Sequence, residues 1–477
     1  MAPRTTKRRP PTRSKSWIPV ALIVAILGGG YVVADIYDVA PGPLTLSEPW
    51  PDPEPFPAAD LPSASPQVVL APDPDAPVPG DDEVTEFVSE FADDPHVGPD
   101  PGILISDAET GRTIAELNAE TPKVPASTTK LLTAIAALDA AGATYRFATS
   151  VVEGTDSDPE GITLVGSGDL TLDPGAGKPD QAIGRGGIAT LAAQVADALA
   201  EQGRTKVTDI AVSEDLWEGP RMAPRWDEQE LNEGWTIRMT PLALNLAKID
   251  GQLARSSEPA RDVAEALADG LAEHGIEVTG EIRFAPTPES APTLGTVESA
   301  PLAELAEYML VYSDNVLAES LGRLVAVESG YPASFEGAGE AIAARLADLD
   351  VATEGLKLAD ASGLSSVNKI SPRTLVDAMN VITADHPDLL ATVRGLPIAG
   401  LEGTLRNRMN DTAAAGVVTA KTGSLRTTAT IAGQVHTADG RLLHVAVMTH
   451  DWDGSLDQAR MGIDRLLVAL AGCGCSP

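Results

Sequence analysis

The segment that follows the N-terminus restricts where this chain can form a folded core. From Asp35 to Gly80 the sequence is dominated by Pro, Asp, Glu and Ala, as in PWPDPEPFP and APDPDAPVPG. Such a composition cannot bury enough apolar surface to offset the entropy lost on ordering, and its prolines hold the backbone extended. We therefore predict a disordered Pro/acidic stalk over residues 35–93 and a folded body from about Asp94 onward.

The first 34 residues have the pattern of a membrane anchor. Residues 1–16 contain Lys and Arg but no acid, and Trp17–Ala34 carries no charge. This stretch is just long enough to span a bilayer, and the basic flank predicts a cytoplasmic tail followed by an exported body. We predict a transmembrane anchor over 17–34 and a single-pass protein of the cell membrane. Val32 and Ala34 leave signal-peptidase cleavage, and therefore secretion, as the alternative.

Charge and composition exclude several classes of protein. The formal net charge is −35, whereas a nucleic-acid-binding protein needs a basic surface. The two cysteines, Cys473 and Cys475, lie at the C-terminus and cannot form a disulfide framework for the fold. The six histidines show no metal-ligand spacing. We therefore expect no nucleic acid, no metal and no cofactor.

The order of expected strands and helices divides the folded body into three segments. A hairpin is expected from Gly102–Asp107 and Thr113–Leu117. Short strands then alternate with Ala-rich helices, before long helices and a final run of strands and one helix close the chain. We predict a catalytic domain made of two segments, 94–149 and 298–477, with an inserted domain (150–297) between them. The expected final elements are strands at Gly416–Ala420, Thr428–His436 and Leu442–Thr449 and a helix at Asp457–Ala471.

A serine and a lysine lie one helical turn apart in the segment VPASTTKLLTAI (Val124–Ile135). Pro125 precedes an Ala/Leu-rich helical pattern, which predicts that Ser127 lies at or near a helix N-terminus. Lys130 follows three positions later on the same face. A hydroxyl needs a base within hydrogen-bond reach to act as a nucleophile, and a lysine with a pKa lowered by burial is such a base. An ordinary N-cap serine beside a solvated lysine is the alternative.

Two further motifs follow in a fixed order. Ser313-Asp314-Asn315 lies between two apolar helical runs, and Lys421-Thr422-Gly423-Ser424 lies on an expected strand. Glycine at position 423 allows another backbone or a substrate to approach closely. The ordered set S-x-x-K, S-D-N and K-T-G is the signature of penicillin-binding proteins and class A β-lactamases. Taken singly, each of these motifs could have a purely structural role: Ser313 and Asn315 as helix caps, and Lys421 and Thr422 as exposed strand residues.

With these motifs the chain resembles the D-alanyl-D-alanine carboxypeptidase/endopeptidase family of low-molecular-mass, class C penicillin-binding proteins. That family has a large insertion after the serine motif, as expected here. Further matching segments are PASTTKLLTA, LVGSGDLTL (Leu164–Leu172, where the family usually has Pro in place of Leu170), Gly234-Trp235, YSDNVLAESL, DASGLSSVN (Asp360–Asn368) and GLPIAGLEGTLRNR (Gly395–Arg408). The implied fold is α+β, of the serine β-lactamase/penicillin-binding type, with an antiparallel sheet flanked by helices.

The resemblance implies a serine D,D-peptidase that acts on peptidoglycan stem peptides and is inhibited covalently by β-lactam antibiotics. Ser127 would attack the carbonyl between two terminal D-alanines, and Lys130 would take its proton. The N–H groups of Ser127 and Ser424 would form the oxyanion hole. The implied catalytic residues are Ser127, Lys130, Ser313 and Lys421, and the implied substrate-binding residues are Asn315, Thr422, Gly423 and Ser424.

Several alternatives stay open at this point. The cleaved bond is either the terminal D-Ala–D-Ala or the D-Ala–diamino-acid cross-link. A serine β-lactamase is the alternative enzyme. Class A β-lactamases carry their deacylating Glu in an E-x-x-L-N motif between S-D-N and K-T-G. Here the matching segment, Glu228–Asn232, precedes Ser313, so we interpret it as a surface helix turn. A penicilloylated sensor or wall-binding scaffold is the alternative without turnover. We expect Asp360 to brace the site structurally and Trp217, Trp226 and Trp235 to belong to the inserted core, with one lining the groove as the alternative.

Overall fold

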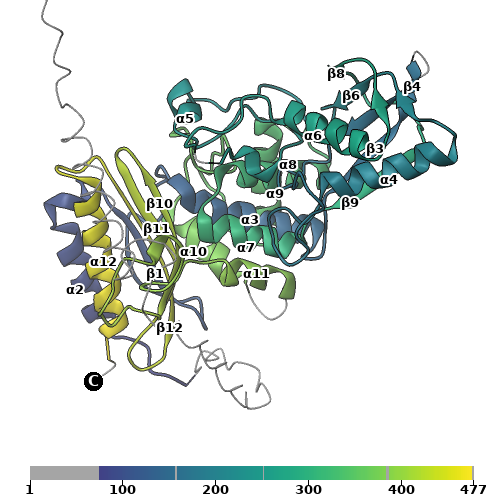
Figure 1. Ribbon diagram of the computed structural model, residues 1–477. Coiled ribbons are helices and arrows are strands. Elements are labelled where there is room, and N and C mark those ends of the chain that lie inside the picture. Colours follow the sequence, from purple (N-terminus) through teal and green to yellow (C-terminus); the bar gives the residue numbers. More distant parts are fainter. Residues whose placement is uncertain (1–74, 156–157, 251, 383–385, 475–477) are drawn as a thin grey trace, which may run out of the picture. The chain divides into compact units, whose positions relative to one another are not determined.

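The chain is described by a computed structural model over residues 75–155, 158–250, 252–382 and 386–474. One part of the molecule is built on a five-stranded antiparallel sheet with the strand order β10-β11-β12-β1-β2 (Figure 1). Strand β1 pairs with β12 from Gly102↔Met448 to Asp107↔Leu443, so segments near the two ends of the described chain share one sheet. The strands are β1 (Gly102–Asp107), β2 (Thr113–Leu117), β10 (Val418–Leu425), β11 (Thr428–His436) and β12 (Leu442–His450).

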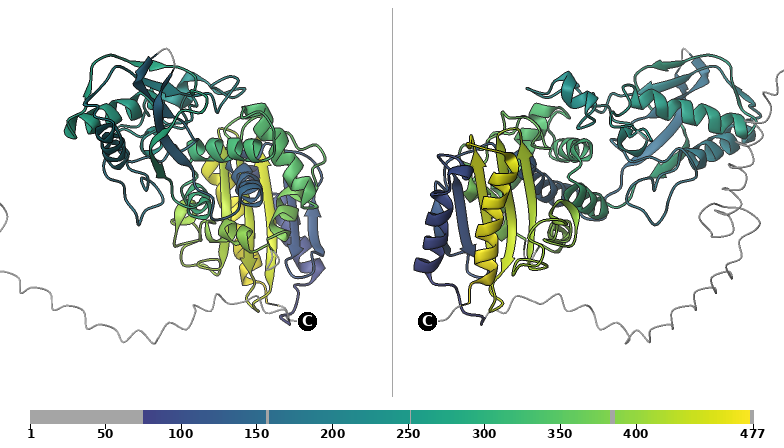
Figure 2. Two further views of the ribbon diagram at one scale, coloured as in Figure 1. Left: turned by 90° about the vertical axis from the view of Figure 1, so that its right-hand side faces the viewer. Right: turned by 60° about the vertical axis from the view of Figure 1, so that its left-hand side comes forward.

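Two helices cover one face of this sheet, α2 (Asp81–Ala92) and α12 (Leu456–Gly472) (Figure 2, right). Helix α2 buries Val84, Val88 and Phe91, which lie at i, i+4 and i+7 and so share one helix face. The predicted stalk is therefore wrong at its C-terminal end, because residues 81–92 are helical and packed. The high Pro and acid content of the preceding residues hid this short amphipathic pattern.

The opposite face is covered by helices around a central one that is almost entirely buried. Helix α3 (Thr129–Ala141) is buried at every position from Thr129 to Leu138, as expected for a helix surrounded by other elements. It packs within one core with the helices that follow the inserted region. These are α7 (Leu302–Tyr312), α8 (Asn315–Glu328), α9 (Phe335–Asp348), α10 (Pro372–Asn380) and α11 (Leu390–Arg394).

Residues 148–298 form a second sheet with its own hydrophobic core. Its strand order is β8-β6-β4-β3-β9, with parallel pairing of β4 with β6 and of β6 with β8. The strands are β3 (Ala148–Thr155), β4 (Asp158–Val165), β6 (Ile210–Ser213), β8 (Ile282–Phe284) and β9 (Thr293–Glu298). Helices α4 (Ile188–Glu201) and α6 (Pro259–Glu273) pack on it, β5 (Lys206–Val207) pairs with β7 (Glu277–Val278), and α5 is the short helix Glu228–Asn232.

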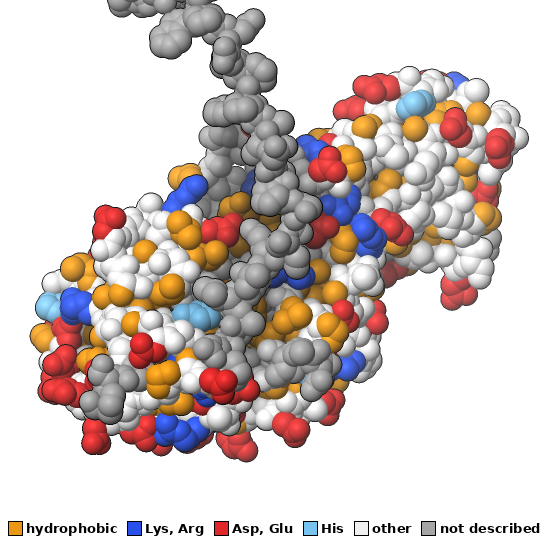
Figure 3. Space-filling view, turned by 90° about the horizontal axis from the view of Figure 1, so that it is seen from below, with side chains coloured by type: hydrophobic (Ala, Val, Ile, Leu, Met, Phe, Trp, Pro, Cys, Tyr) orange, Lys and Arg blue, Asp and Glu red, His pale blue; other side chains and the backbone are white. Residues whose placement is uncertain are grey.

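The predicted basic tail (1–16), the anchor (17–34) and most of the stalk lie outside the described residues, as does Cys475. Within the described ranges, no helix has the length and hydropathy needed to cross a bilayer. On the face shown in Figure 3, acidic side chains are spread among apolar and basic ones. The negative charge on this face is thus distributed, without a single acidic patch.

Candidate active site

Ser127 lies where a 3-10 turn, Ala126–Thr128, runs into helix α3, so the prediction that it lies at or near a helix N-terminus is confirmed. Ala126 has a left-handed φ of 49°, a conformation that costs a non-glycine residue free energy. Gly363, with φ +83°, packs against it: a Cβ there would lie 1.8 Å from the Ala126 carbonyl oxygen. The turn that presents Ser127 is therefore held by a contact that only glycine permits.

Lys130 is fully buried beneath Ser127 and contacts three oxygen atoms. Its Nζ lies 3.0 Å from Ser127 Oγ, 2.7 Å from Asn315 Oδ1 and 2.6 Å from the Ser362 carbonyl oxygen. Two of these are carbonyl oxygens and accept only, so they occupy both N–H groups of a neutral amine. The remaining lone pair then faces the Ser127 hydroxyl.

The pKa of Lys130 fits the role of a base. Burial lowers it to about 8, although the charges of Asp360, Asp314 and Glu319 act to raise it. A substantial fraction of this lysine is therefore neutral near pH 8, and a neutral amine can take a proton.

Ser313 and Lys421 form a second hydroxyl–lysine pair. Ser313 ends α7 in the left-handed conformation, with φ 55°, and the Lys421 Nζ donates to its Oγ at 3.0 Å and to the Thr422 carbonyl at 2.9 Å. Burial lowers the pKa of Lys421 well below its usual value, and the charge of Lys130 adds to this effect. The three predicted motifs thus meet in one place.

Asp314, which sequence reasoning did not single out, holds the Ser313 turn. It is buried, caps α8 by accepting the Leu317 N–H at 3.1 Å, and pairs with Arg255 at 3.0 Å and with Lys248 at 3.5 Å. Burial raises the pKa of Asp314, but Arg255 and Lys248 outweigh this and leave it lowered. The inserted region therefore helps to position the S-D-N motif through a charged contact.

Strand β10 places its backbone against Ser127. A Cβ added at Gly423 would lie 2.7 Å from the Pro125 carbonyl oxygen and 3.0 Å from the Ser127 nitrogen. This is the kind of close approach that the sequence predicted for Gly423. It brings the N–H of Ser127 next to the strand that carries Thr422 and Ser424.

A cavity of about 920 Å³ opens above these residues. Its lining includes Ser127, Ser313, Asn315, Thr422 and Ser424, while Lys130 and Lys421 lie buried below. Trp235, 55% exposed, also lines it, as the alternative for one tryptophan had it. Trp226 and Trp217 pack in the core around α3, not in the core of the second sheet, so the prediction that the three tryptophans belong to the inserted core is wrong. The charged lining residues are Asp227, Glu230, Glu233, Arg225, Arg408, Arg426 and Arg460.

The E-x-x-L-N segment forms the short exposed helix α5, as predicted. Glu228, the acid of that motif, pairs with Arg238 and is not among the residues that line the cavity. Its neighbours Gln229 and Glu230 do line the cavity, so the helix borders the site although its motif acid points elsewhere.

Asp360 braces the floor of the site, as expected. Its carboxylate accepts from the N–H groups of Gly363 (2.8 Å) and Ser365 (2.6 Å), from Asn368 Nδ2 (2.7 Å) and from Trp226 Nε1 (2.9 Å). Trp226 is buried in the core of the helices that follow the insertion. These bonds fix the loop whose Ser362 carbonyl contacts Lys130.

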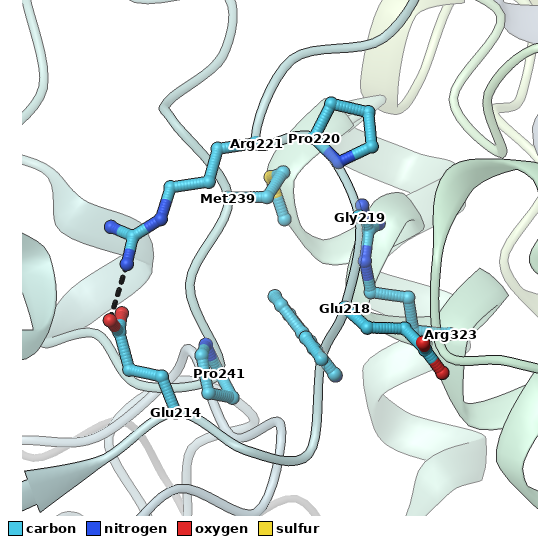
Figure 4. A pocket seen from close by; sticks show the side chains of 9 residues that line it. Glu214, Glu218, Gly219, Pro220, Arg221, Met239, Pro241 and Arg323 are labelled. Atoms are coloured by element: carbon cyan, nitrogen blue, oxygen red, sulfur yellow. Dashed lines mark hydrogen bonds and ion pairs between the residues drawn. The ribbon is translucent and has the colours of Figure 1, made fainter. Parts of the chain in front are cut away.

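A buried ion pair behind Lys130 was missed by sequence reasoning. Glu319 accepts the Ser362 N–H at 2.9 Å and pairs with Arg323 at 3.4 Å, one turn on in α8. The Arg323 guanidinium lies over the rings of Trp217 (4.9 Å) and Phe335 (4.1 Å). Arg323 also borders a small cavity of about 50 Å³ next to loop residues of the inserted region (Figure 4). The sequence feature that could have revealed this ion pair is the presence of two charged residues, one helical turn apart, within an otherwise apolar helical run.

Burial makes Glu319 a weaker acid than an exposed glutamic acid. Burial and the charge of Asp360 raise its pKa to about 7, against the opposing effect of Arg323. No group of three or more His, Cys, Asp or Glu side chains suited to a metal ion is found in the portion of the chain that the structure describes.

Comparison with known proteins relates this site to one family. Residues 84–254 and 242–470 match the model of the D-Ala-D-Ala carboxypeptidase 3 (S13) family. The chain is 38% identical over 392 residues to Carboxypeptidase DacB of Mycolicibacterium smegmatis, covering 79% of this chain and 82% of that protein. It is 25% identical over 443 residues to the D-alanyl-D-alanine carboxypeptidase of Actinomadura sp., covering 76% and 80%.

The fold is also found among solved structures. Penicillin-binding protein 4 (dacB) from Haemophilus influenzae superposes with a TM-score of 0.66 at 22% identity, covering 79% of this chain and 97% of that one. Its complex with a β-lactam gives a TM-score of 0.59 at 21% identity, covering 80% and 99%. The expected α+β penicillin-binding fold, an antiparallel sheet flanked by helices, is therefore confirmed.

Proposed function

This chain belongs to the D-Ala-D-Ala carboxypeptidase (S13) family of serine peptidases, and from that premise we propose that Ser127 is its nucleophile and Lys130 its general base. The observation that carries the proposal is the set of three contacts of the Lys130 Nζ. Two carbonyl acceptors direct its lone pair at Ser127, whose hydroxyl loses its proton as the oxygen attacks the carbonyl of the penultimate D-alanine. The enzyme is a penicillin-binding serine D,D-peptidase.

The oxyanion that forms in this attack needs donors that are already in place. The N–H groups of Ser127 and Ser424 are our candidates, since β10 packs tightly against Ser127 at Gly423. A preorganised donor of this kind contributes roughly 3–4 kcal/mol to transition-state stabilisation. The fit between β10 and the serine turn is therefore integral to the proposed chemistry.

Collapse of the tetrahedral intermediate requires a proton on the leaving amine. We assign this transfer to the Ser313 hydroxyl, which lies 3.0 Å from the Lys421 Nζ. The C–N bond breaks, the terminal D-alanine leaves with that proton, and the acyl group stays on Ser127. The proton that Lys130 took from Ser127 then restores the Ser313 hydroxyl, which leaves Lys130 neutral. Water attacks the ester with Lys130 again as base, and the Ser127 oxygen leaves with a proton as the shortened stem peptide is released.

A β-lactam would acylate the same serine oxygen, and the resulting acyl-enzyme would hydrolyse slowly. The class A β-lactamase route to fast deacylation uses the acid of E-x-x-L-N, and here Glu228 pairs with Arg238 outside the cavity lining. This placement favours the peptidase over the β-lactamase. Burial of a lysine side chain costs free energy, and here two buried lysines each lie within hydrogen-bond distance of a serine hydroxyl. A scaffold without turnover has no need of this arrangement and is therefore disfavoured.

We propose that residues 17–34 anchor the protein in the cell membrane and that the stalk carries the peptidase domain to the peptidoglycan outside. The support is the uncharged stretch and its basic flank. The intact mass of the native protein tests the anchor: a mass that lacks the residues before Asp35 would contradict it and favour secretion.

Intact mass after incubation with benzylpenicillin tests the nucleophile. We expect one stable adduct on the wild type and none on Ser127→Ala. Destruction of the drug without an adduct would favour a β-lactamase, and intact drug without an adduct would favour a scaffold. Release of D-alanine from a stem pentapeptide, compared with cleavage of a cross-linked dimer, then assigns carboxypeptidase or endopeptidase preference.

A further inference from the structure

A short loop on the floor of the site is held by two buried carboxylates. Glu319 Oε1 accepts the N–H groups of Ala361 at 3.1 Å and of Ser362 at 2.9 Å. Asp360 accepts the next N–H group, that of Gly363, at 2.8 Å. Three consecutive N–H groups are therefore fixed by carboxylate oxygens, and a charged acceptor makes each of these bonds stronger than one between neutral groups.

Fixing these N–H groups also fixes the carbonyls of the loop. In a trans peptide the C=O points away from the N–H of the following residue, so the N–H groups of Ser362 and Gly363 set the directions of the Ala361 and Ser362 carbonyls. The Ala361 carbonyl accepts from Thr133 Oγ1 at 2.7 Å, and the Ser362 carbonyl accepts from the Lys130 Nζ at 2.6 Å. Both donors belong to α3, so the loop is joined to the helix that carries the base.

Both carbonyl acceptors of Lys130 are controlled from one face of α8. Asn315 Oδ1 accepts from the Lys130 Nζ directly, at 2.7 Å. Glu319 lies four positions later on the same helix face and holds the backbone at Ser362, whose carbonyl is the second acceptor. A displacement of either acceptor would change the direction of the lysine lone pair.

The charge of Glu319 has a separate effect on the base. The charged groups around its carboxylate are Arg323 on α8, Asp360 on the loop and Lys130 on α3. Burial lowers the pKa of Lys130 to about 8, and the charges of Asp360, Asp314 and Glu319 act to raise it. The carboxylate oxygen thus fixes a position, while the carboxylate charge adjusts the pKa of the base.

We propose that Glu319 is a positioning residue for acyl transfer: its carboxylate holds the backbone at Ser362 so that the Ser362 carbonyl stays against the Lys130 Nζ. The lone pair of the amine then remains directed at Ser127. Glu319 is fully buried and is not among the residues that line the cavity, so it acts through the loop and not on the substrate. The inference rests on the proposed function, because it concerns the base assigned there.

The test compares two double variants of the full chain, Glu319→Gln/Arg323→Met and Glu319→Leu/Arg323→Met. Both remove the two buried charges together, so neither leaves a lone ion in the core. Only the glutamine variant keeps an oxygen that can accept the N–H groups of Ala361 and Ser362. Stopped-flow acylation by benzylpenicillin, measured from about pH 6 to about pH 10, gives a limiting rate and a midpoint for each variant.

The limiting rate at high pH reports the position of the Ser362 carbonyl. It should fall roughly 10–100-fold in the leucine variant and less than about threefold in the glutamine variant, because a displacement of about 1 Å near the reacting groups can cost about 100-fold. The midpoint reports the charge. It should move down by about one unit in both variants, since the Glu319 charge that raises the pKa of Lys130 is gone.

Phe91→Ala is the matched control for lost stability, since Phe91 packs in the core on the other face of the sheet. It should lower the melting temperature but keep the wild-type limiting rate and midpoint. An exponential rate constant does not depend on the fraction of protein that is folded, so destabilisation alone changes neither quantity. If the leucine variant fails to fold, the midpoint of the glutamine variant decides the question.

The failure of this inference differs from the failure of the proposed function. Equal limiting rates in the two double variants, or an unmoved midpoint in the glutamine variant, would overturn the assignment of Glu319 while leaving the peptidase intact. A wild type that benzylpenicillin does not acylate would contradict the proposed function, and the inference with it.

Discussion

The backbone carbonyl of Trp235 accepts a hydrogen bond of 2.9 Å from the Nδ2 of Asn315. This contact determines which way the Asn315 amide faces, because a carbonyl can accept only from the NH₂ group. The amide oxygen is thereby directed at the Lys130 Nζ, 2.7 Å away. The loop that contains Trp235 thus orients the Asn315 side chain toward Lys130, the base that we propose.

Asn315→Asp should impair acylation by two routes. A carboxylate next to Lys130 would raise the pKa of the lysine by about 1–3 units and keep it protonated, and the Trp235 carbonyl would lose its donor. We expect the rate of acylation by benzylpenicillin at pH 7 to fall roughly 10–1000-fold, with the midpoint of its pH profile moved upward. Asn232→Asp, at the exposed end of α5, is the control. An unmoved midpoint would contradict the assigned amide orientation.

The pH dependence of acylation should follow the titration of Lys130. Its pKa is lowered to about 8 by burial, and only the neutral amine can take the proton of Ser127. The rate should therefore rise about tenfold per pH unit below this value and level off above it. Stopped-flow acylation at constant ionic strength measures the profile, with thermal unfolding recorded at each pH as the control. A rate that falls as the pH rises from 6 to 8 would argue against a lysine base.

Gly423→Ala should separate the nucleophile from its oxyanion hole. The added methyl group would lie 2.2 Å from Thr430 Oγ1 and 2.7 Å from the Pro125 carbonyl oxygen, so β10 must move away from Ser127. We expect acylation to fall at least about 100-fold, as for loss of an oxyanion donor, with a cost of about 1–3 kcal/mol in stability. Gly80→Ala, where nothing lies within 4 Å of the new methyl group, should acylate normally.

Removal of either member of the Glu319–Arg323 pair should be costly, and removal of both much less so. Each group is buried. Glu319→Gln would leave the Arg323 guanidinium as an uncompensated charge, at about 3–5 kcal/mol. Arg323→Met would remove the charge that holds down the already raised pKa of Glu319, so Glu319 would become neutral and the ion pair would be lost. Urea unfolding of Glu319→Gln, Arg323→Met and the double variant forms the cycle. The double variant should lose clearly less stability than the sum of the singles. Additive losses would mean that the two side chains do not act as a pair.

Phe91→Ala tests the helix that replaces the end of the predicted stalk. Phe91 is 5% exposed and packs in the core on the α2–α12 face of the sheet, so truncation should cost about 3–5 kcal/mol. Glu90→Ala, at the neighbouring exposed position, should change stability by less than about 0.5 kcal/mol. Thermal or urea unfolding compares them, and equal stability of the two variants would show that α2 does not contribute to the core.

Elements with strong local patterns were predictable from the sequence alone. The hairpin Gly102–Asp107 and Thr113–Leu117 and the strand Thr428–His436 form with the expected bounds, because alternation is encoded in neighbouring residues. The contact between Ser127 and Lys130 is equally local, since three positions on a helix bring two side chains onto one face. The three-motif order placed the chain in its family before any contact was known.

Contacts between distant segments were decided only by the tertiary structure. Asp314 with Arg255, Ser424 with Arg460 and Asn315 with the Trp235 carbonyl join residues from 36 to 80 positions apart. No periodicity links such residues, because their meeting depends on how the helices and the two sheets pack. Burial is likewise a property of the folded chain, and burial is what lowers the pKa of Lys130 to about 8. The sequence by itself thus identified the family and the groups that we propose carry the chemistry, and the packing determined the charge states and partners of those groups.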